Sequence, residues 1–338
     1  MPETVLDQVL VDLKESASTF YPGSGELHNL RVVGHAPKHD HFVYELCADF
    51  AGGVERMAVK VYRPGKKSAQ AKDRARQENA NLLYAHESLS RKKVAGVPRP
   101  LGDFSRLGAV VTAKVSGLPL QSMIMKAALL PGSAAGNVAA AARHAGEWLR
   151  RFHKATAQVP PPFDGGAVMS RLEALCADCR EQGLDEGSIQ MVLSGARAAL
   201  TRIKKPLPNS AVLGEFTPLN VMVTEDGAGF SDFSNLQRQS ASLEDVAQFV
   251  ASVEELEKYP FCDRNITCGV QESFLAAYGA TPAESALLPV LKIKALLETL
   301  AQGRRGDENR HRKRVMWANI MRKFIRQAAQ RSLEPAAA

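Results

Sequence analysis

The sequence predicts an α+β protein of two lobes: a small mixed β-sheet lobe over residues 1–113 and a larger helical lobe over residues 114–338. Three observations predict this. Short runs of the β type crowd the chain between residues 30 and 120. Beyond residue 118 apolar residues recur at spacings of three and four, interrupted by one hairpin pattern. The 338 residues are also enough to build two cores.

The first lobe is expected to contain an N-terminal amphipathic helix, a five-strand sheet and one further helix. In the third strand Met57, Val59 and Val61 point to one face, while Lys60 and its neighbours at positions 58 and 62 point to the other. The further helix interrupts the order of the strands. We expect strands at residues 30–34, 41–50 and 56–64 and two more within 97–120, and the helix at 68–92.

The second lobe is expected to be helical apart from one hairpin near residue 226. Strands at 220–223 and 228–231 would flank the turn residues Asp226 and Gly227. Asn220 lies six residues before Asp226 and Asp232 six after, so the hairpin would bring these two side chains together. An amide oxygen and a carboxylate are half of a Mg²⁺ site, although a surface hairpin with polar ends explains this stretch alone equally well. Helices are expected at 136–156, 170–184, 188–203, 242–259, 270–279, 282–301 and 312–330.

The composition is that of a soluble protein, with 45% apolar and 23% charged residues. No apolar run is long enough to span a bilayer and the N-terminus lacks a signal pattern, so we expect a cytoplasmic protein. Five cysteines, an odd number, do not indicate a disulfide framework. Cys176 and Cys179 share one helix face and are interpreted as structural thiols rather than zinc ligands.

The positive charge of the chain is concentrated near the C-terminus. Residues 301–338 hold ten Lys or Arg and three Asp or Glu, whereas residues 1–300 balance. Two interpretations of residues 304–331 are open. They form a last helix that packs on the helical lobe, or they make peripheral contact with the anionic inner membrane face or a lipid-linked glycan. Nucleic acid is not an expected partner, because the aromatic residues among these charges are limited to Trp317 and Phe324.

Several motifs occur in an order that resembles the protein-kinase-like fold, and more closely the aminoglycoside, choline and fructosamine kinases, a family of small-molecule phosphotransferases. The resemblance covers about residues 30–290. The motifs are "MAVKVY", "RQENANLL", "VVTAKVSGLPL", "GEWLRRFHKA", "LGEFTPLNVMV", "SDFSN" and "SLEDVAQFV".

The resemblance implies ATP and Mg²⁺ as cofactors and gives each site residue a role. Lys60 would grip the nucleotide phosphates and Glu78 would pair with it; Asn220 and Asp232 would bind Mg²⁺, and Glu215 would be the base that orients the acceptor hydroxyl. These roles suit phosphoryl transfer, which needs charge stabilisation and positioning more than covalent chemistry. The resemblance further places adenine against Thr112, Ala113, Lys114 and Val115, makes Asp245 a brace for the loop that carries Glu215, and leaves His153 as a core or capping histidine.

The chain departs from the family pattern at three positions of the site. Leu213 replaces the usual histidine, which removes one hydrogen bond that braces the loop. Glu215 replaces the usual aspartate and Ser234 replaces a glycine. Glutamate keeps the carboxylate but lengthens the side chain, so two hypotheses stay open: an active phosphotransferase, and a pseudokinase that binds nucleotide or a partner without transferring phosphate.

The acceptor is expected to be a small molecule with a hydroxyl group. Protein kinases commonly place lysine two residues after the catalytic carboxylate, where this chain has Thr217 followed by Pro218. No Ala-Pro-Glu segment follows "SDFSN" to dock a peptide. The resemblance to the family suggests a sugar or glycan intermediate.

Overall fold

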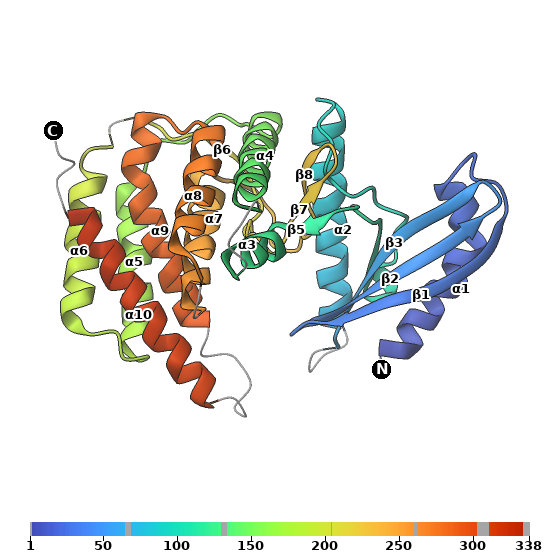
Figure 1. Ribbon diagram of the computed structural model, residues 1–338, viewed down its shortest axis with the longest axis horizontal. Coiled ribbons are helices and arrows are strands. Elements are labelled where there is room, and N and C mark those ends of the chain that lie inside the picture. Colours follow the sequence, from blue (N-terminus) through green and yellow to red (C-terminus); the bar gives the residue numbers. More distant parts are fainter. Residues whose placement is uncertain are drawn as a thin grey trace. The chain divides into compact units, whose positions relative to one another are not determined.

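The computed structural model describes residues 2–64, 69–129, 134–203, 205–259, 262–302 and 311–333 (Figure 1). The chain forms two compact units. The first comprises residues 1–117 and 224–236, and the second comprises residues 118–223 and 237–338. The predicted combination of a small β-sheet lobe with a larger helical lobe is confirmed, and the sheet of the first unit is antiparallel. Residues 224–236, which were expected in the second lobe, belong to the first unit.

The first unit is built on an antiparallel sheet of four strands in the order β1-β2-β3-β4. Two long helices and one short 3₁₀ helix, η1, accompany the sheet. In chain order the elements are α1 (Pro2–Phe20), β1 (Leu27–Pro37), β2 (His41–Phe50), β3 (Gly53–Tyr62), α2 (Ala69–Ser90), η1 (Ser105–Leu107), β4 (Ala109–Ala113) and, from the later segment, β8 (Gly227–Phe230).

Helix α1 covers one face of this sheet (Figure 1). Val9 and Leu13 of the helix are fully buried in one cluster with Met57 and Val59 of β3. Each such side chain stabilises the fold by about 1.5–3 kcal/mol when it is fully buried. The alternation predicted for β3 is therefore correct, and it turns Lys60 and Tyr62 away from the α1 cluster.

The sheet has four strands rather than the expected five. The stretch before η1 contains Pro98 and Pro100, which have no N–H group to donate to a strand ladder. Pro100 makes only an isolated bridge to Thr112. The other strand expected in this stretch is β4, and the two-residue β5 (Leu118–Pro119) at its end pairs with β7 (Val221–Thr224) instead of joining the sheet of the first unit.

The second unit is mostly helical and also contains short strands. Its seven expected helices are present. The two-stranded sheet of β6 and β9 was not expected, because each strand is only four or five residues long. The elements are α3 (Leu120–Leu129), α4 (Ala134–Ala155), α5 (Gly165–Arg180), α6 (Glu186–Leu200), β6 (Asn209–Val212), β9 (Gln237–Ala241), α7 (Leu243–Glu255), η2 (Leu256–Lys258), α8 (Arg264–Tyr278), α9 (Pro282–Gln302) and α10 (His311–Leu333).

Helices α4 and α8 pack closely in the core of the second unit. Gly146 of α4 permits this approach, because a Cβ atom at this position would overlap the carbonyl oxygen of Phe274 on α8. Phe274 stacks on Phe249 with ring centroids 3.9 Å apart, and both rings contact Phe216. Trp148 of α4 stacks on the other side of the cluster, 6.0 Å from Phe216. This aromatic cluster anchors the loop that contains Phe216.

Helix α10 packs against α6 and α9 (Figure 1). Its apolar side chains Met321, Phe324 and Ile325 are buried. Arg326 pairs with Asp185 at 2.7 Å. Residues 304–310 of the segment expected to contact a membrane lie outside the described residues, as do the side chains of 311–316. Across the described part of the chain, no helix has the length and apolarity to cross a bilayer, and contact with a membrane surface stays a prediction.

Candidate functional site

Lys60 lies between two carboxylates in the first unit. Its Nζ donates to Glu78 Oε1 at 2.8 Å and to Asp232 Oδ1 at 3.0 Å. The side chains of Lys60, Glu78 and Asp232 are 12%, 5% and 18% exposed. Strand β3, helix α2 and the segment after β8 each supply one of the three. The structure thus joins three residues that the sequence singled out, two of them 172 positions apart.

Lys60 and Asp232 each stabilise the charge of the other, whereas burial raises the pKa of Glu78. Burial alone would lower the pKa of Lys60, but Glu78 and Asp232 outweigh burial and raise it above its ordinary value. Burial would likewise raise the pKa of Asp232, but the Lys60 ammonium and hydrogen bonds from Ser234 lower it to about 2. At neutral pH Lys60 is therefore an ammonium ion and Asp232 a carboxylate.

Tyr62 also belongs to the cluster, although the motifs assign it no role. It follows Lys60 by two residues on β3, so both side chains leave the same face of the strand. Its hydroxyl donates to Glu78 Oε2 at 2.6 Å. Burial and the nearby Glu78 raise the pKa of Tyr62, so the hydroxyl keeps its proton. Both carboxylate oxygens of Glu78 therefore have donors. The alternation of β3 was the only signal that pointed to Tyr62.

Helix α2 fixes the Asp232 segment as well as Lys60. Asn81, three residues after Glu78, donates from Nδ2 to the carbonyl oxygens of Phe233 at 3.0 Å and Leu236 at 3.3 Å. Residues three apart share a helix face, so one face of α2 supports both parts of the cluster. Ser234 donates to Asp232 Oδ1 from its backbone N at 3.0 Å and from Oγ at 2.7 Å. The serine that replaces the family's glycine thus orients the carboxylate.

Glu215 lies in an exposed loop of the second unit. It stands between Gly214, whose φ is +77°, and Phe216, which is fully buried in the aromatic cluster. Asn220 Nδ2 donates to the carbonyl oxygen of Glu215 at 3.1 Å. This bond closes the loop and turns the amide oxygen of Asn220 away from the carbonyl oxygen of Glu215. The loop therefore carries Glu215 on a backbone that is fixed on both sides.

Asp245 at the start of α7 braces the same loop. Its completely buried carboxylate accepts hydrogen bonds from Leu213 N at 2.8 Å and Gly214 N at 3.0 Å. His153 Nε2 lies 3.2 Å from Asp245 Oδ2, and His153 Nδ1 lies 3.1 Å from the Tyr278 hydroxyl. Because a carboxylate only accepts, Nε2 is the donor to Asp245. His153 is a buried core residue, and the loop is held through its backbone although Leu213 cannot offer a side-chain bond.

The residues expected to contact adenine lie at the end of β4 and just beyond it. Thr112 and Ala113 are the last residues of the strand and pair with Ala58 and Met57 of β3. The backbone N of Lys114 donates to Arg56 O at 2.9 Å. Its ammonium group pairs with Glu45 Oε1 at 2.6 Å. Val115 follows and is half-buried. All four residues lie in the first unit, as Lys60 does.

The site residues described above divide between the two units. Lys60, Glu78 and Asp232 lie together in the first unit, and Glu215 and Asn220 lie together in the second. Strands β7 and β8 and a short turn form the predicted hairpin, and the unit boundary passes through it. A joint metal site of Asn220 and Asp232 therefore stays a prediction. Among the described residues, no group of three or more His, Cys, Asp or Glu side chains is arranged to hold a metal ion.

A model of the phosphotransferase enzyme family matches residues 49–288. This is more than half of the chain and includes every site residue named above. The chain belongs to this family. The family match agrees with the resemblance seen in the motifs. No curated protein matches the chain in sequence.

Solved structures with the same fold include several kinases of small molecules. One is a glucosamine kinase in complex with glucosamine, ADP and inorganic phosphate, with a TM-score of 0.61 and 16% identity over 92% of this chain and 84% of that chain. A choline/ethanolamine kinase family protein from Mesorhizobium loti has a TM-score of 0.57 and 16% identity over 98% and 96%. An amicoumacin kinase in complex with AMP-PNP and Ca²⁺ has a TM-score of 0.54 and 14% identity over 95% and 96%. The protein-kinase-like fold is confirmed.

Proposed function

We propose that the protein is an ATP- and Mg²⁺-dependent phosphotransferase that phosphorylates a hydroxyl group of a small molecule. The observation that carries the proposal is the position of Lys60 Nζ between Glu78 and Asp232. Membership of the phosphotransferase family supports it. So do the ligands of two complexes with this fold, which are ADP in the glucosamine kinase and AMP-PNP with Ca²⁺ in the amicoumacin kinase.

The residues present suit a nucleotide and a hard cation. Lys60 has three N–H donors, of which the two carboxylates occupy two, so one is left for a phosphate oxygen. The ionised carboxylate of Asp232 and the amide oxygen of Asn220 are ligand types that Mg²⁺ prefers. When bound, Mg²⁺ would neutralise charge on the phosphates. Asp232 and Asn220 would hold it, and Thr112 to Val115 would contact adenine.

Glu215 supplies the group that handles the acceptor proton. Its exposed carboxylate would accept the proton of the acceptor hydroxyl at a side-chain oxygen. The hydroxyl oxygen would bond to the terminal phosphorus of ATP, the bond from this phosphorus to the bridging oxygen would break, and ADP would leave. The extra methylene relative to aspartate requires a well-fixed backbone. Asp245 provides it through Leu213 and Gly214. This support favours an active enzyme over a pseudokinase.

Release of ADP in the presence of ATP, Mg²⁺ and a panel of sugars, amino sugars and amino alcohols tests the proposal. We expect acceptor-dependent ADP release. Lys60→Ala and Asp232→Ala should weaken binding of ATP·Mg²⁺, measured by calorimetry, because each removes a charge that the nucleotide complex needs. Undiminished affinity in both variants would refute the placement of the nucleotide.

Replacement of Glu215 separates the enzyme from the pseudokinase. Glu215→Gln should lower turnover by about a hundredfold or more, the scale for losing a general base, with ATP affinity nearly unchanged. Glu215→Asp reports how much the length of the side chain matters. Glu272→Gln, an exposed position on α8, is the matched control. Nucleotide binding without ADP release from any acceptor in the wild type indicates the pseudokinase.

A further inference from the structure

The turn between β1 and β2 is attached to helix α2 by a chain of three side chains. The carboxylate of Asp40 accepts hydrogen bonds at both oxygens: Oδ1 lies 2.7 Å from His41 Nδ1, and Oδ2 lies 2.9 Å from Arg74 Nη1. The backbone carbonyl oxygen of Asp40 accepts a bond from Arg63 N at 2.8 Å. Asp40 is therefore fixed through both its backbone and its side chain, and it orients the ring of His41.

The His41 ring lies beside the cluster around Lys60. His41 pairs with Tyr62 in the register of β2 and β3, so the two side chains leave the same face of the sheet. Their ring centroids are 5.8 Å apart, and the His41 side chain is 13% exposed. Arg74 lies one helical turn before Glu78, so the same face of α2 supports the turn and the cluster. The first unit thus places an imidazole near the ammonium group to which the proposed function assigns the phosphates.

The charges around His41 keep its ring neutral in the protein without nucleotide. Among the described residues, the charged and titratable groups around the ring are Asp40 of the turn, Lys60 and Tyr62 of β3, Arg74 and Glu78 of α2, and Asp232 after β8. Burial and the Lys60 ammonium lower the pKa of His41. The carboxylates of Asp40 and Asp232 offset this effect only in part. At pH 7 the ring is therefore uncharged.

The bond to Asp40 decides what Nε2 of the neutral ring can do. Burial would raise the pKa of Asp40, but His41 and Arg74 lower it, so Asp40 is a carboxylate that only accepts. Nδ1 of His41 therefore carries the hydrogen, and Nε2 carries a lone pair. A phosphate oxygen is also an acceptor and cannot bond to this form of Nε2. Protonation turns Nε2 into a donor, and the negative charge of a phosphate favours the protonated ring.

We propose that a phosphate group of the bound nucleotide accepts a hydrogen bond from His41 Nε2, and that the protein takes up a proton from solvent at this nitrogen as ATP binds. The inference rests on the proposed function, because it requires a nucleotide at Lys60, and it adds a dependence of nucleotide affinity on pH. Residues 37–41 contain no glycine, so a ligand beside this turn meets side chains rather than bare backbone. Asp40 and Arg74 are positioning residues, because they act through the ring. The affinity rises as the pH falls, because the complex binds a proton that the free protein lacks.

Calorimetry of ATP binding to the full-length protein, with excess Mg²⁺ and no acceptor, tests this inference. The heat at pH 7 is measured in Pipes and in imidazole buffer, whose ionisation enthalpies differ, so the difference in heat gives the number of protons taken up. We expect the wild type to take up part of a proton and to bind ATP about tenfold more tightly at pH 5.5 than at pH 8, the order of magnitude for one hydrogen bond to a charged group. His41→Asn keeps an N–H group for Asp40 but cannot be protonated, so it should lose this uptake and this pH dependence. Protonation of ATP itself is common to both proteins and cancels in the comparison.

His86→Asn is the matched control in the first unit. His86 also lies on α2, eight residues after Glu78 and about 12 Å further along the helix. Burial and the charge of Arg99 lower the pKa of His86, as burial and Lys60 do for His41. We expect His86→Asn to take up as many protons as the wild type and to keep its pH dependence.

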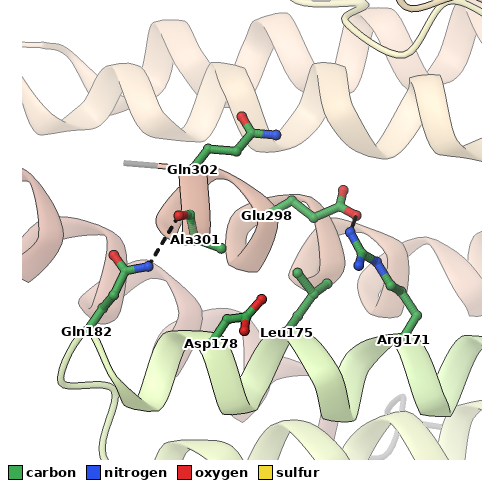
Figure 2. Close-up of a pocket in the computed structure, with 7 residues that line it drawn as sticks. All are labelled: Arg171, Leu175, Asp178, Gln182, Glu298, Ala301 and Gln302. Carbon is green, nitrogen blue, oxygen red and sulfur yellow. Dashed lines mark hydrogen bonds and ion pairs between the residues drawn. The ribbon is translucent and has the colours of Figure 1, made fainter. Parts of the chain in front are cut away.

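Glu298→Gln is the control in the second unit. Glu298 Oε1 accepts from Arg171 at 3.0 Å at a groove of about 540 Å³ between α5 and α9, and no histidine is among the described residues that line this groove (Figure 2). The substitution removes a charge without removing a histidine, the side chain that ordinarily titrates near neutral pH. We expect wild-type proton uptake in this variant as well.

Equal proton uptake by the wild type and His41→Asn overturns the inference, and so does uptake that His86→Asn abolishes. The wild type alone also decides, should His41→Asn fail to fold. ATP binding that depends on Lys60 but gives the same heat in both buffers overturns the inference and leaves the proposed function standing. A wild type that binds no ATP overturns both.

Discussion

Replacing Tyr62 with phenylalanine deletes one oxygen atom from the interior of the first unit and creates no cavity larger than that atom. The lost hydroxyl donates to Glu78 Oε2 at 2.6 Å, and Glu78 is only 4% exposed. Water cannot easily replace a donor there. A hydrogen bond to a charged group contributes about 1.5–3 kcal/mol. We therefore expect Tyr62→Phe to lower the stability of the first unit by about 2 kcal/mol.

Hydrogen exchange measured by mass spectrometry is the suitable assay. Both tryptophans, Trp148 and Trp317, lie in the second unit, so tryptophan fluorescence would not report on the first. A loss of about 2 kcal/mol corresponds to roughly thirtyfold faster exchange in peptides of β3 and α2 that open with the whole unit. Peptides of α4 and α8 should exchange as in the wild type.

Tyr21→Phe is the matched control. The Tyr21 hydroxyl is also buried but has no hydrogen-bond partner among the described residues. Its removal should be neutral or slightly stabilising, because an unsatisfied polar group leaves the interior. If Tyr62→Phe and Tyr21→Phe exchange at the same rate, the bond to Glu78 contributes nothing and the reasoning fails. Under the proposed function, Tyr62→Phe should also bind ATP more weakly.

Three further perturbations probe other parts of the molecule. The pKa of Asp232 is lowered to about 2 from an ordinary 3.8, so its carboxylate stabilises the first unit at neutral pH, and this stabilisation is lost as the pH falls from 4 through 2. The stability difference between Asp232→Asn and wild type, followed by hydrogen exchange, should therefore shrink over that window, and a constant difference contradicts the reasoning. Asp245→Ala leaves two loop N–H groups without their acceptor and should lower the free energy of unfolding by about 3 kcal/mol. Urea unfolding followed by Trp148 fluorescence should therefore show a lower midpoint, and an unchanged midpoint shows that the brace is dispensable. Deletion of residues 311–338 should cause aggregation, seen by gel filtration, because it exposes the residues that pack against the buried Phe324. A truncated protein that stays folded and no longer sediments with acidic vesicles would favour the membrane interpretation.

The sequence was informative where function depends on local pattern. The alternation of β3 placed Lys60 on the correct face, and the spacing of apolar residues located every long helix of the second unit. The strand count failed at Pro98 and Pro100, because apolar and β-branched residues around them suggested a strand that lacks the N–H groups to form one. A strand in a sheet needs both suitable apolar or β-branched residues and backbone N–H groups that can donate to its neighbour.

Features that depend on distant partners were not predictable. Nothing around Asp232 indicates that its segment packs with α2, since this contact depends on the distant Asn81. Tyr62 looked like any aromatic strand residue until the position of Glu78 was known.

The membership of residues 224–236 in the first unit bears on how the protein folds during synthesis. The strand β8 donates from Phe230 N to Gly96 O at 2.8 Å, and Phe230 and Phe233 are buried. When residue 117 leaves the ribosome, α2 and β3 are complete but their partners are still about 120 residues away. At about 5–20 residues per second the ribosome needs roughly 6–24 s to supply them. During that time Lys60 has no Asp232 to pair with, and the surface that residues 224–236 later cover stays exposed. An N-terminal fragment that ends before residue 224 therefore lacks part of its own unit.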